Sequence, residues 1–386
     1  MTESPGFAPR AAIAGIGHTE FSKDSGRSEL RLACEASRAA IADAGLTPAD
    51  IDGTVTFTLD ANSENEVMNS LGIREVGWMS RTPNGGAGAA ATVQHAAAAI
   101  HAGLCRNVLI YRAFNERSGK RFGVQTGPVR SGGENWHVPY GLRTPAQMYG
   151  LWYHRWMLER GMSNADLGHY TVTARAYAAT NPHAWFHGRP ITHDDHQNSR
   201  WIVEPVLRLL DCCQESDGGV ALVVTGADRA RDLRDGPVAR IAAAAQADVF
   251  GGVTTTNYYH DDLAAFPEAE SVARRLWAAA GLGPGDIQAA MLYENFSPVV
   301  FMLLESLGFC GRGESADFVR DGHLGPGGKL PVNTHGGLLG EGYIHGMNSI
   351  VEAVRQIRGG AANQVAGVEH VLVSAGASGL ILAADS

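Results

Sequence analysis

Residues 40–53, AIADAGLTPADIDG, and residues 276–289, LWAAAGLGPGDIQA, carry one pattern of small, apolar and turn residues twice in the chain. The alanine–glycine–leucine step, the proline and the aspartate–isoleucine pair match at a constant offset of 236 residues. The Ser-Leu-Gly steps at 70–72 and 306–308 keep the same offset. Several matches in one order at one offset indicate an internal repeat, which has to be recognised before a fold is assigned.

The apolar segments on either side of these stretches repeat as well. The similar pairs are Ala11–Ala14 and Ala239–Ala242, Asn107–Ile110 and His370–Val373, and Gly219–Val224 and Gly379–Ala384. We therefore expect an α/β protein made of two duplicated halves, residues 9–228 and 236–386, with helices packed on sheets. One doubly wound sheet with coincidental matches is the alternative.

Each half shows the same succession of strand, helix, strand, glycine-rich loop and buried helix. Ser28 is suited to be the N-cap of the first helix, and Gly45 and Gly281 are suited to end the first helix of each half. The first helices are expected at 28–44 and 269–280, and the second strands at 54–59 and 289–293. The buried helices after the glycine-rich loops are expected at 87–102 and 337–357.

A long insertion, residues 114–201, interrupts the first half. It is rich in His, Trp, Tyr and Arg and predicts a helix at 145–160. Long insertions on a rigid core often bind ligands or cover a site.

The composition of the 386 residues excludes several classes of protein. Forty acidic and 31 basic residues give a net charge of −9, which argues against a nucleic-acid binder. The five cysteines form no CxxC pair, so neither a disulfide framework nor a zinc site is expected. The chain shows no signal peptide and no apolar run of membrane-spanning length, so we expect a soluble, cytoplasmic protein.

The repeat also predicts where ligands bind. Applied to Tyr293, the offset leads to Phe57, near the C-terminal end of the second strand of the first half, where open α/β sheets bind ligands. Glycine-rich loops at 84–88 and 333–337 lead into helices, and their backbone amides could stabilise a developing oxyanion. The alternative is that these glycines only allow two helices to pack closely.

Several motifs resemble those of the thiolase superfamily, in the same order along the chain. They are LPVNTHGG at 330–337 with GEGYIHG at 340–346, YENF at 293–296, SAGASG at 374–379, and LLDCC at 209–213 with SDGG at 216–219. The last pair is most similar to thiolases of the sterol carrier protein type. The resemblance covers essentially the whole chain. It implies a layered αβαβα homodimer that acts on coenzyme A thioesters, with the insertion as a loop domain over the pantetheine.

The departures from the thiolase pattern exclude thiolase chemistry. A thiolase attacks with a cysteine thiolate on the first glycine loop, but residues 84–89 read NGGAGA. Tyr343 and Tyr293 occupy the positions of the thiolase histidine and of its asparagine or histidine, and Ser374 occupies that of the second cysteine. We expect Cys212 and Cys213 to be structural residues on the core side of the following strand.

Two tyrosines thus replace two groups that face the thioester. A phenol has a reference pKa near ~10 and can donate or accept a proton, which suits exchange with an alcohol or an enolate carbon. These are the transfers of a retro-aldol cleavage of a β-hydroxyacyl-CoA. The alternative is that Tyr293 and Tyr343 only fill the space of a degenerate site.

Three further stretches resemble the actinobacterial steroid side-chain-cleaving aldolases: 21–30, 111–119 and 343–348. The resemblance implies cleavage of the CoA ester of a 17-hydroxy steroid with a three-carbon acid chain into a 17-ketosteroid and propionyl-CoA. Tyr293 would be the base and Tyr343 the acid, without a bound cofactor, since coenzyme A enters with the substrate. It also implies a small zinc-ribbon-associated OB-fold partner from an acyl-CoA hydratase.

Five further residues are candidates for oxyanion or substrate binding: Gly85, Gly86, His335, His345 and Gly376. The two histidines flank the tyrosine loop, and packing roles are an equal alternative for them. Two other functions stay open. The chain could be a non-catalytic subunit that binds acyl-CoA or sterol, or an acyltransferase with an unrecognised nucleophile.

Overall fold

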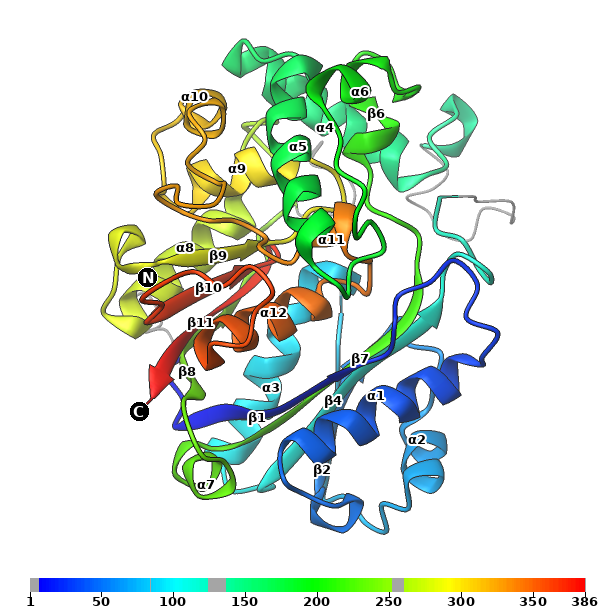
Figure 1. Cartoon of the computed structure of the whole chain (residues 1–386), viewed down its shortest axis with the longest axis vertical. Helices are drawn as coiled ribbons and strands as arrows, with labels where there is room; N and C mark the ends of the chain where they lie inside the picture. Colours follow the sequence, from blue (N-terminus) through cyan, green and yellow to red (C-terminus); the bar gives the residue numbers. More distant parts are fainter. Residues whose placement is uncertain (1–6, 84, 124–136, 252–259, 386) are drawn as a thin grey trace.

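The structure is a computed structural model that describes residues 7–83, 85–123, 137–251 and 260–385. The described residues form a nine-stranded mixed sheet and a separate two-stranded sheet, β5–β6 (Figure 1). In spatial order, the strands of the large sheet are β3 (Trp78–Thr82), β2 (Gly53–Phe57), β4 (Asn107–Asn115), β7 (Asp217–Gly226), β1 (Ala11–His18), β8 (Val238–Gln246), β11 (Ser378–Asp385), β10 (His370–Ser374) and β9 (Ala289–Leu292).

The strand order repeats around the antiparallel pair β1–β8, which joins Ala12 to Arg240 and Ile13 to Ala239. On one side β7 and β4 follow as antiparallel neighbours and β2 runs parallel to β4. On the other side β11 and β10 follow as antiparallel neighbours and β9 runs parallel to β10. This repeat agrees with the expected duplication; the boundaries 9–228 and 236–386 stay a prediction.

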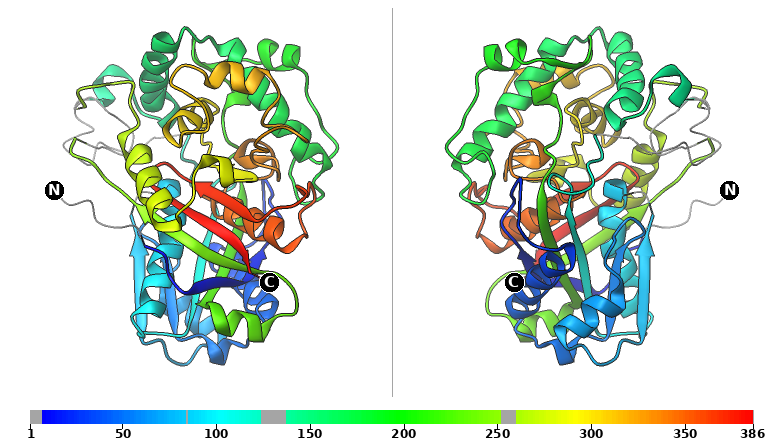
Figure 2. Two further views of the ribbon diagram at one scale, coloured as in Figure 1. Left: turned by 90° about the vertical axis from the view of Figure 1, so that its left-hand side faces the viewer. Right: turned by 90° about the vertical axis from the view of Figure 1, so that its right-hand side faces the viewer.

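Helices cover both faces of each half of the sheet and form layers (Figures 1 and 2). Helix α1 (Glu29–Asp43) packs on β1, β7 and β4, and α8 (Pro267–Ala280) packs on β8 and β11. Between the two halves, α3 (Ala89–His101) and α12 (Met347–Arg358) contact strands of both. The thiolase-like αβαβα arrangement follows, because each half of the sheet buries one face against the central helices and one against an outer helix.

The insertion forms helices at one end of the molecule, opposite α2 and α7 in Figure 1. The predicted helix at 145–160 is confirmed as α4 (Pro145–Arg160). The remaining elements are α2 (Glu64–Leu71), α5 (Asn164–Thr180), α6 (His193–Asn198), β5 (Trp201–Val203), β6 (Leu207–Arg208), α7 (Ala227–Leu233), α9 (Pro298–Ser306), α10 (Ser315–Arg320) and α11 (Gly337–Gly340). No helix among the described residues is long and apolar enough to span a bilayer.

The predicted helix caps are confirmed. The Ser28 side chain accepts a hydrogen bond from the Arg31 backbone N–H, which satisfies one free donor of the first turn. Gly45 and Gly281 have φ of +69° and +65°, the left-handed conformation in which glycine ends a helix at low cost.

The continuous helix expected at 337–357 is wrong. A short turn, α11, ends at Gly340, and α12 begins only at Met347. His345 and Gly346, just before α12, have φ of +50° and +76°, which the interior of an α-helix does not allow. The chain therefore leaves the helical path between α11 and α12, and the resulting loop carries Tyr343 and His345.

Candidate active site

A cavity of about 1030 Å³ lies where the insertion meets the first glycine loop and the loop between α11 and α12. Its lining includes Gly85 and Gly86 from the first loop, Tyr293 from the end of β9, and Tyr343 and His345 from the α11–α12 loop. Ligand pockets usually enclose ~300–1,000 Å³, so this volume suits a large substrate.

The two predicted tyrosines meet at the wall of this cavity. Their hydroxyl oxygens are 2.8 Å apart, a hydrogen bond in which either phenol can be the donor. Tyr293 directly follows β9, and its backbone N–H donates to the Ser374 carbonyl at 2.8 Å. The backbone N–H of Tyr343 donates to the Ser216 hydroxyl at 3.2 Å. Burial raises the pKa of both phenols well above the ordinary value, so both are neutral at rest.

Asn333 fixes the end of the strand that carries Tyr293. Its side-chain oxygen accepts from the Leu292 N–H at 2.9 Å, and its side-chain nitrogen donates to the Leu292 carbonyl at 2.8 Å. The same nitrogen donates to the Tyr170 hydroxyl at 2.7 Å. Asn333 itself has φ of +53°, a conformation that asparagine tolerates better than most residues.

The glycines of the first loop leave room for the phenol pair. A Cβ atom on Gly86 would lie 2.2 Å from the Tyr293 hydroxyl oxygen, and one on Gly346 would lie 2.9 Å from the same ring. Gly85 has φ of +48° and lies beside the His345 ring. Asn84, from the same motif, lies outside the described residues. Gly86 and Gly346 are therefore needed for close approach to Tyr293.

His345 reaches the cavity as a neutral ring. The Arg112 Nε donates to its Nδ1 at 3.1 Å, and Arg112 in turn pairs with Asp60 at 2.9 Å. Burial, followed by the Arg112 charge, lowers the pKa of His345 well below its usual value. The ring stacks on Phe122, with 5.5 Å between centroids.

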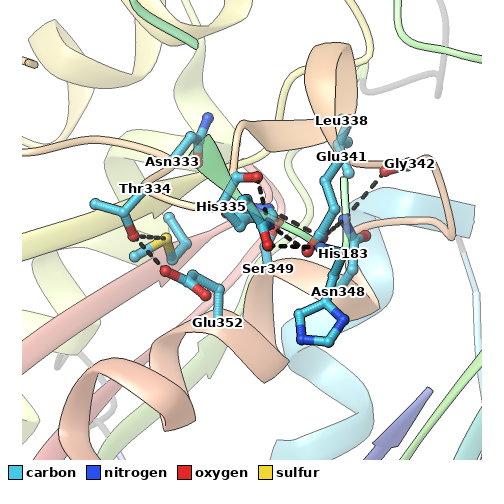
Figure 3. A network of polar contacts seen from close by, with 12 residues as sticks. His183, Asn333, Thr334, His335, Leu338, Glu341, Gly342, Asn348, Ser349 and Glu352 are labelled. Carbon is cyan, nitrogen blue, oxygen red and sulfur yellow. Dashed lines mark hydrogen bonds and ion pairs between the residues drawn. The ribbon is translucent and has the colours of Figure 1, made fainter. Parts of the chain in front are cut away.

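His335 does not reach the cavity. Figure 3 shows its side chain in a buried polar network with Glu341, Asn348 and Ser349. Its Nε2 is 3.5 Å from the Ser349 hydroxyl and 3.9 Å from a Glu341 oxygen, and burial lowers its pKa to about 3. The loop turns sharply at Gly336, where φ is +100°, and the side chain lies against α12 instead of the substrate space.

Gly376 lets the Phe266 ring pack closely behind the wall of the cavity. The residues before and after it line the cavity, and a Cβ atom on Gly376 would lie 2.3 Å from the Phe266 ring. Its N–H donates to the Ser374 hydroxyl at 3.3 Å. Ser374, the residue at the position of the second thiolase cysteine, is fully buried.

Cys212 and Cys213 were expected to be structural residues on the core side of the strand, and both pack against the hydrophobic core. Both also line the cavity. Burial raises the pKa of both thiols, which disfavours the thiolate that a nucleophile requires. The structure describes no group of three potential metal ligands among residues 7–83, 85–123, 137–251 and 260–385.

Three residues at or behind the cavity were missed. Glu116 lines the cavity, and burial raises the pKa of its carboxyl group to about 9. Arg112 and Asp60 are buried behind His345. A charged residue inside the apolar strand 107–115 was the available signal for Arg112, since a buried charge needs a partner.

Aromatic, cationic and acidic side chains line much of the rest of the cavity. The aromatic residues are Phe122, Tyr149, Trp152, Tyr153, Phe186, Phe266 and Phe296, with Trp152 and Phe266 edge to face at 4.9 Å between centroids. The cations are Lys23, Arg117, Arg121, Arg175 and Arg200, and the further acidic residues are Glu215, Asp248 and Glu268, of which Glu215 pairs with Arg121. Apolar walls together with more cations than these carboxylates suit a ligand with an apolar body and an anionic end.

The layered fold and the paired phenols define a thiolase-like protein without the loop cysteine. A family model described as thiolase C-terminal domain-like matches residues 252–385. The chain is 55% identical to the steroid side-chain-cleaving aldolase of Thermomonospora curvata, over the whole of both chains. It therefore belongs to the family of steroid side-chain-cleaving aldolases, carbon–carbon lyases built on the thiolase fold.

Other comparisons agree. The chain is 55% identical to the 17-hydroxy-3-oxo-4-pregnene-20-carboxyl-CoA lyase of Mycobacterium tuberculosis, over 97% of this chain and 99% of that protein. The solved Ltp2–ChsH2(DUF35) aldolase superposes with a TM-score of 0.93 at 54% identity, over 98% of this chain and 99% of that chain. An SCP2-thiolase-like protein of Mycobacterium smegmatis, 21% identical over 98% of this chain and 78% of that chain, shares the fold with a TM-score of 0.72.

Proposed function

We propose that this chain cleaves the Cα–Cβ bond of a β-hydroxyacyl-CoA, the CoA ester of a 17-hydroxy steroid with a three-carbon acid chain. The products are a 17-ketosteroid and propionyl-CoA. The names of two relatives at 55% identity support this substrate class. The observation that carries the chemistry is the pair of phenols, 2.8 Å apart at the cavity wall and facing a loop without cysteine.

The reaction needs two proton transfers and no acyl-enzyme. Tyr293 accepts the proton of the tertiary hydroxyl while the Cα–Cβ bond breaks and the ketone C=O forms. The bonding electron pair passes into the thioester as an enolate, and Tyr343 donates its proton to Cα. A proton that crosses from Tyr293 to Tyr343 restores both phenols, so the enzyme neither gains nor loses a proton.

The two transfers are coupled. Burial raises the pKa of both phenols well above the ordinary value, so a free phenolate is unfavourable in this site. The 2.8 Å bond lets Tyr293 pass its own proton to Tyr343 as it accepts another. Tyr343 gives its own proton to Cα in the same event, so only partial negative charge develops on the thioester oxygen and both tyrosines stay neutral phenols.

Other parts of the cavity support the substrate. His345 and the backbone amides of Gly85 and Gly86 are assigned to the thioester oxygen, where donors stabilise an enolate. The aromatic wall takes the steroid. The cavity cations take the phosphates of coenzyme A, which arrives with the substrate and not as a bound cofactor.

We also propose a cytoplasmic homodimer that binds a small OB-fold protein, zinc-ribbon-associated and derived from an acyl-CoA hydratase. The name of the solved Ltp2–ChsH2(DUF35) aldolase, 54% identical to this chain, supports the partner. Size-exclusion chromatography with light scattering on the chain, with and without the partner, tests the assembly. A monomer that stays separate from the partner contradicts it.

The function is tested by co-expressing the chain with this partner and supplying the 17-hydroxy steroid CoA ester. We expect stoichiometric propionyl-CoA and 17-ketosteroid by liquid chromatography, and an unmodified protein mass. Ligand binding without products would indicate a non-catalytic subunit. A protein mass increased by an acyl group would indicate an acyltransferase.

The pH dependence of cleavage distinguishes coupled transfer from a resting phenolate. We expect kcat to be constant between pH 7.5 and 8.5. This range is chosen because it lies above the pKa of about 7 of Glu341, a carboxyl group behind the tyrosine loop. Above pH 9 kcat should fall, because Glu116 has a pKa of about 9 and its ionisation adds negative charge beside the enolate.

Glu116→Gln is the matched variant for this profile. It cannot ionise, so kcat should stay flat above pH 9. The test is a pH–rate profile of kcat for both proteins at saturating substrate. Saturation is needed because Lys23, which also lines the cavity, has a pKa of about 8, and its loss of charge would change KM over the pH range of the profile. A wild-type kcat that rises with pH would contradict coupled transfer.

A further inference from the structure

We propose that Asp60 and Arg112 are positioning residues that hold His345 as the neutral tautomer with its proton on Nε2. The ring then presents a single fixed N–H donor to the substrate oxygen in the cavity. The assignment of the acceptor as a thioester oxygen rests on the proposed function, whereas the assignment of the His345 tautomer does not.

Arg112 is placed rigidly. It lies in β4, with its side chain about 2% exposed, and its guanidinium is 4.4 Å from the Phe114 ring centroid. Its Nη1 donates to a carboxylate oxygen of Asp60 at 2.9 Å. A planar guanidinium held at one nitrogen by a carboxylate and at its face by a ring has little freedom to rotate.

Asp60 is held by further donors. One carboxylate oxygen accepts from the backbone and side-chain N–H groups of Asn62, both at 2.8 Å. The other accepts from Arg112 and from the Ala113 backbone N–H at 3.2 Å. A carboxylate that accepts these four hydrogen bonds is held in one orientation, and it fixes the Arg112 guanidinium in turn.

The contact between Arg112 and His345 determines the tautomer. The Arg112 Nε is 3.1 Å from the His345 Nδ1. A guanidinium has donors and no acceptor, so the Nδ1 atom must present its lone pair. The proton of a neutral imidazole is then on Nε2, and the adjacent positive charge disfavours a second proton.

The Nε2 edge of His345 is left for a ligand. Nothing in the described part of the chain accepts a hydrogen bond from Nε2, and the residue lines the cavity. A Cβ atom on Gly85 would lie 3.8 Å from Nε2, so this edge faces the first glycine loop. His345 has φ of +50°, which histidine rarely adopts, and the surrounding contacts hold it there.

The first test is a nitrogen NMR spectrum of the full chain with its partner, labelled with ¹⁵N-histidine, at pH 7. His345→Gln identifies the His345 signals by their loss. We expect one protonated nitrogen, Nε2, and one unprotonated nitrogen, Nδ1. A proton on Nδ1, or on both nitrogens, would overturn the proposal whether or not the chain cleaves a steroid.

The second test is Arg112→Lys. Lysine keeps the positive charge that pairs with Asp60, but its single nitrogen replaces the two guanidinium nitrogens that contact His345 and Asp60. We expect a mixed His345 tautomer and a kcat about tenfold or more lower, with KM nearly unchanged, because the donor matters most to the enolate. Arg160→Lys is the matched control. Arg160 is likewise a nearly buried arginine that pairs with a carboxylate, Glu305, and lies over an aromatic ring, but it belongs to α4 and has no contact with His345 or Asp60 among the described residues.

The proposal would be overturned if Arg112→Lys showed a pure Nε2–H tautomer and the same kcat as Arg160→Lys. If Arg112→Lys fails to fold, the wild-type spectrum decides. A chain with the expected tautomer but without propionyl-CoA release contradicts the proposed function and leaves the tautomer assignment standing.

Discussion

Tyr293→Phe will lower kcat for steroid side-chain cleavage by about 10²–10⁴-fold, the usual contribution of one acid–base group. The change removes the hydroxyl that is 2.8 Å from the Tyr343 hydroxyl and leaves the ring in place. The substrate hydroxyl then has no acceptor and Tyr343 has no source for its next proton. The fold should be retained, because the backbone bond from Tyr293 to Ser374 does not involve the phenol.

The measurement is propionyl-CoA release in a single turnover, with substrate binding followed separately by calorimetry. We expect binding within about threefold of wild type, since the lost group acts in the transition state. Tyr140→Phe is the matched control, because Tyr140 is 80% exposed and does not line the cavity. Equal kcat for the two variants would remove Tyr293 from the mechanism.

Gly86→Ala will inactivate the enzyme about as strongly as Tyr293→Phe, although it adds a single methyl group. The new Cβ atom would lie 2.2 Å from the Tyr293 hydroxyl oxygen and 2.3 Å from its ring, far inside normal contact. Either the phenol moves, which breaks its bond to Tyr343, or the loop moves, which displaces the Gly85 and Gly86 amides proposed for the thioester oxygen. Overpacking of this kind typically costs about 1–3 kcal/mol of stability, so most of the protein should stay folded.

Kinetics and thermal unfolding of Gly86→Ala separate these effects. Gly360→Ala is the control, because a Cβ atom there would meet nothing within 4 Å. The double variant Gly86→Ala/Tyr293→Phe should be no slower than the slower single variant, because both changes disable one unit. A fully active Gly86→Ala enzyme would show that the phenol pair is not needed in this geometry.

The sequence predicted the topology better than the loops. Paired strands and capped helices follow from local patterns, and the helix stops at Gly45 and Gly281 occurred where expected. The segment 337–357 misled because its two ends, 337–340 and 347–357, are apolar and helix-like, while its middle carries Gly342 and Gly346. Positive φ at His345 and Gly346 separates α11 from α12.

The two candidate histidines show the limit of sequence reasoning at the site. His335 and His345 flank the same loop and are equivalent by spacing. His335 lies in a buried network, and His345 lies at the cavity against Arg112. Arg112 and Asp60 could not be connected with His345 from the sequence, because Arg112 lies in β4 and Asp60 in the turn after β2, both far from His345 along the chain.

The sequence by itself determined the duplicated α/β topology, the helix caps, the absence of a loop cysteine and the two tyrosines, because these depend on residue type and order. Tertiary structure alone decided that phenols 50 residues apart lie within 2.8 Å, that His345 and not His335 lines the cavity, and that Cys212 and Cys213 border it. The reason is physical: distances between segments remote in the chain are set by how the two sheet halves and the insertion pack.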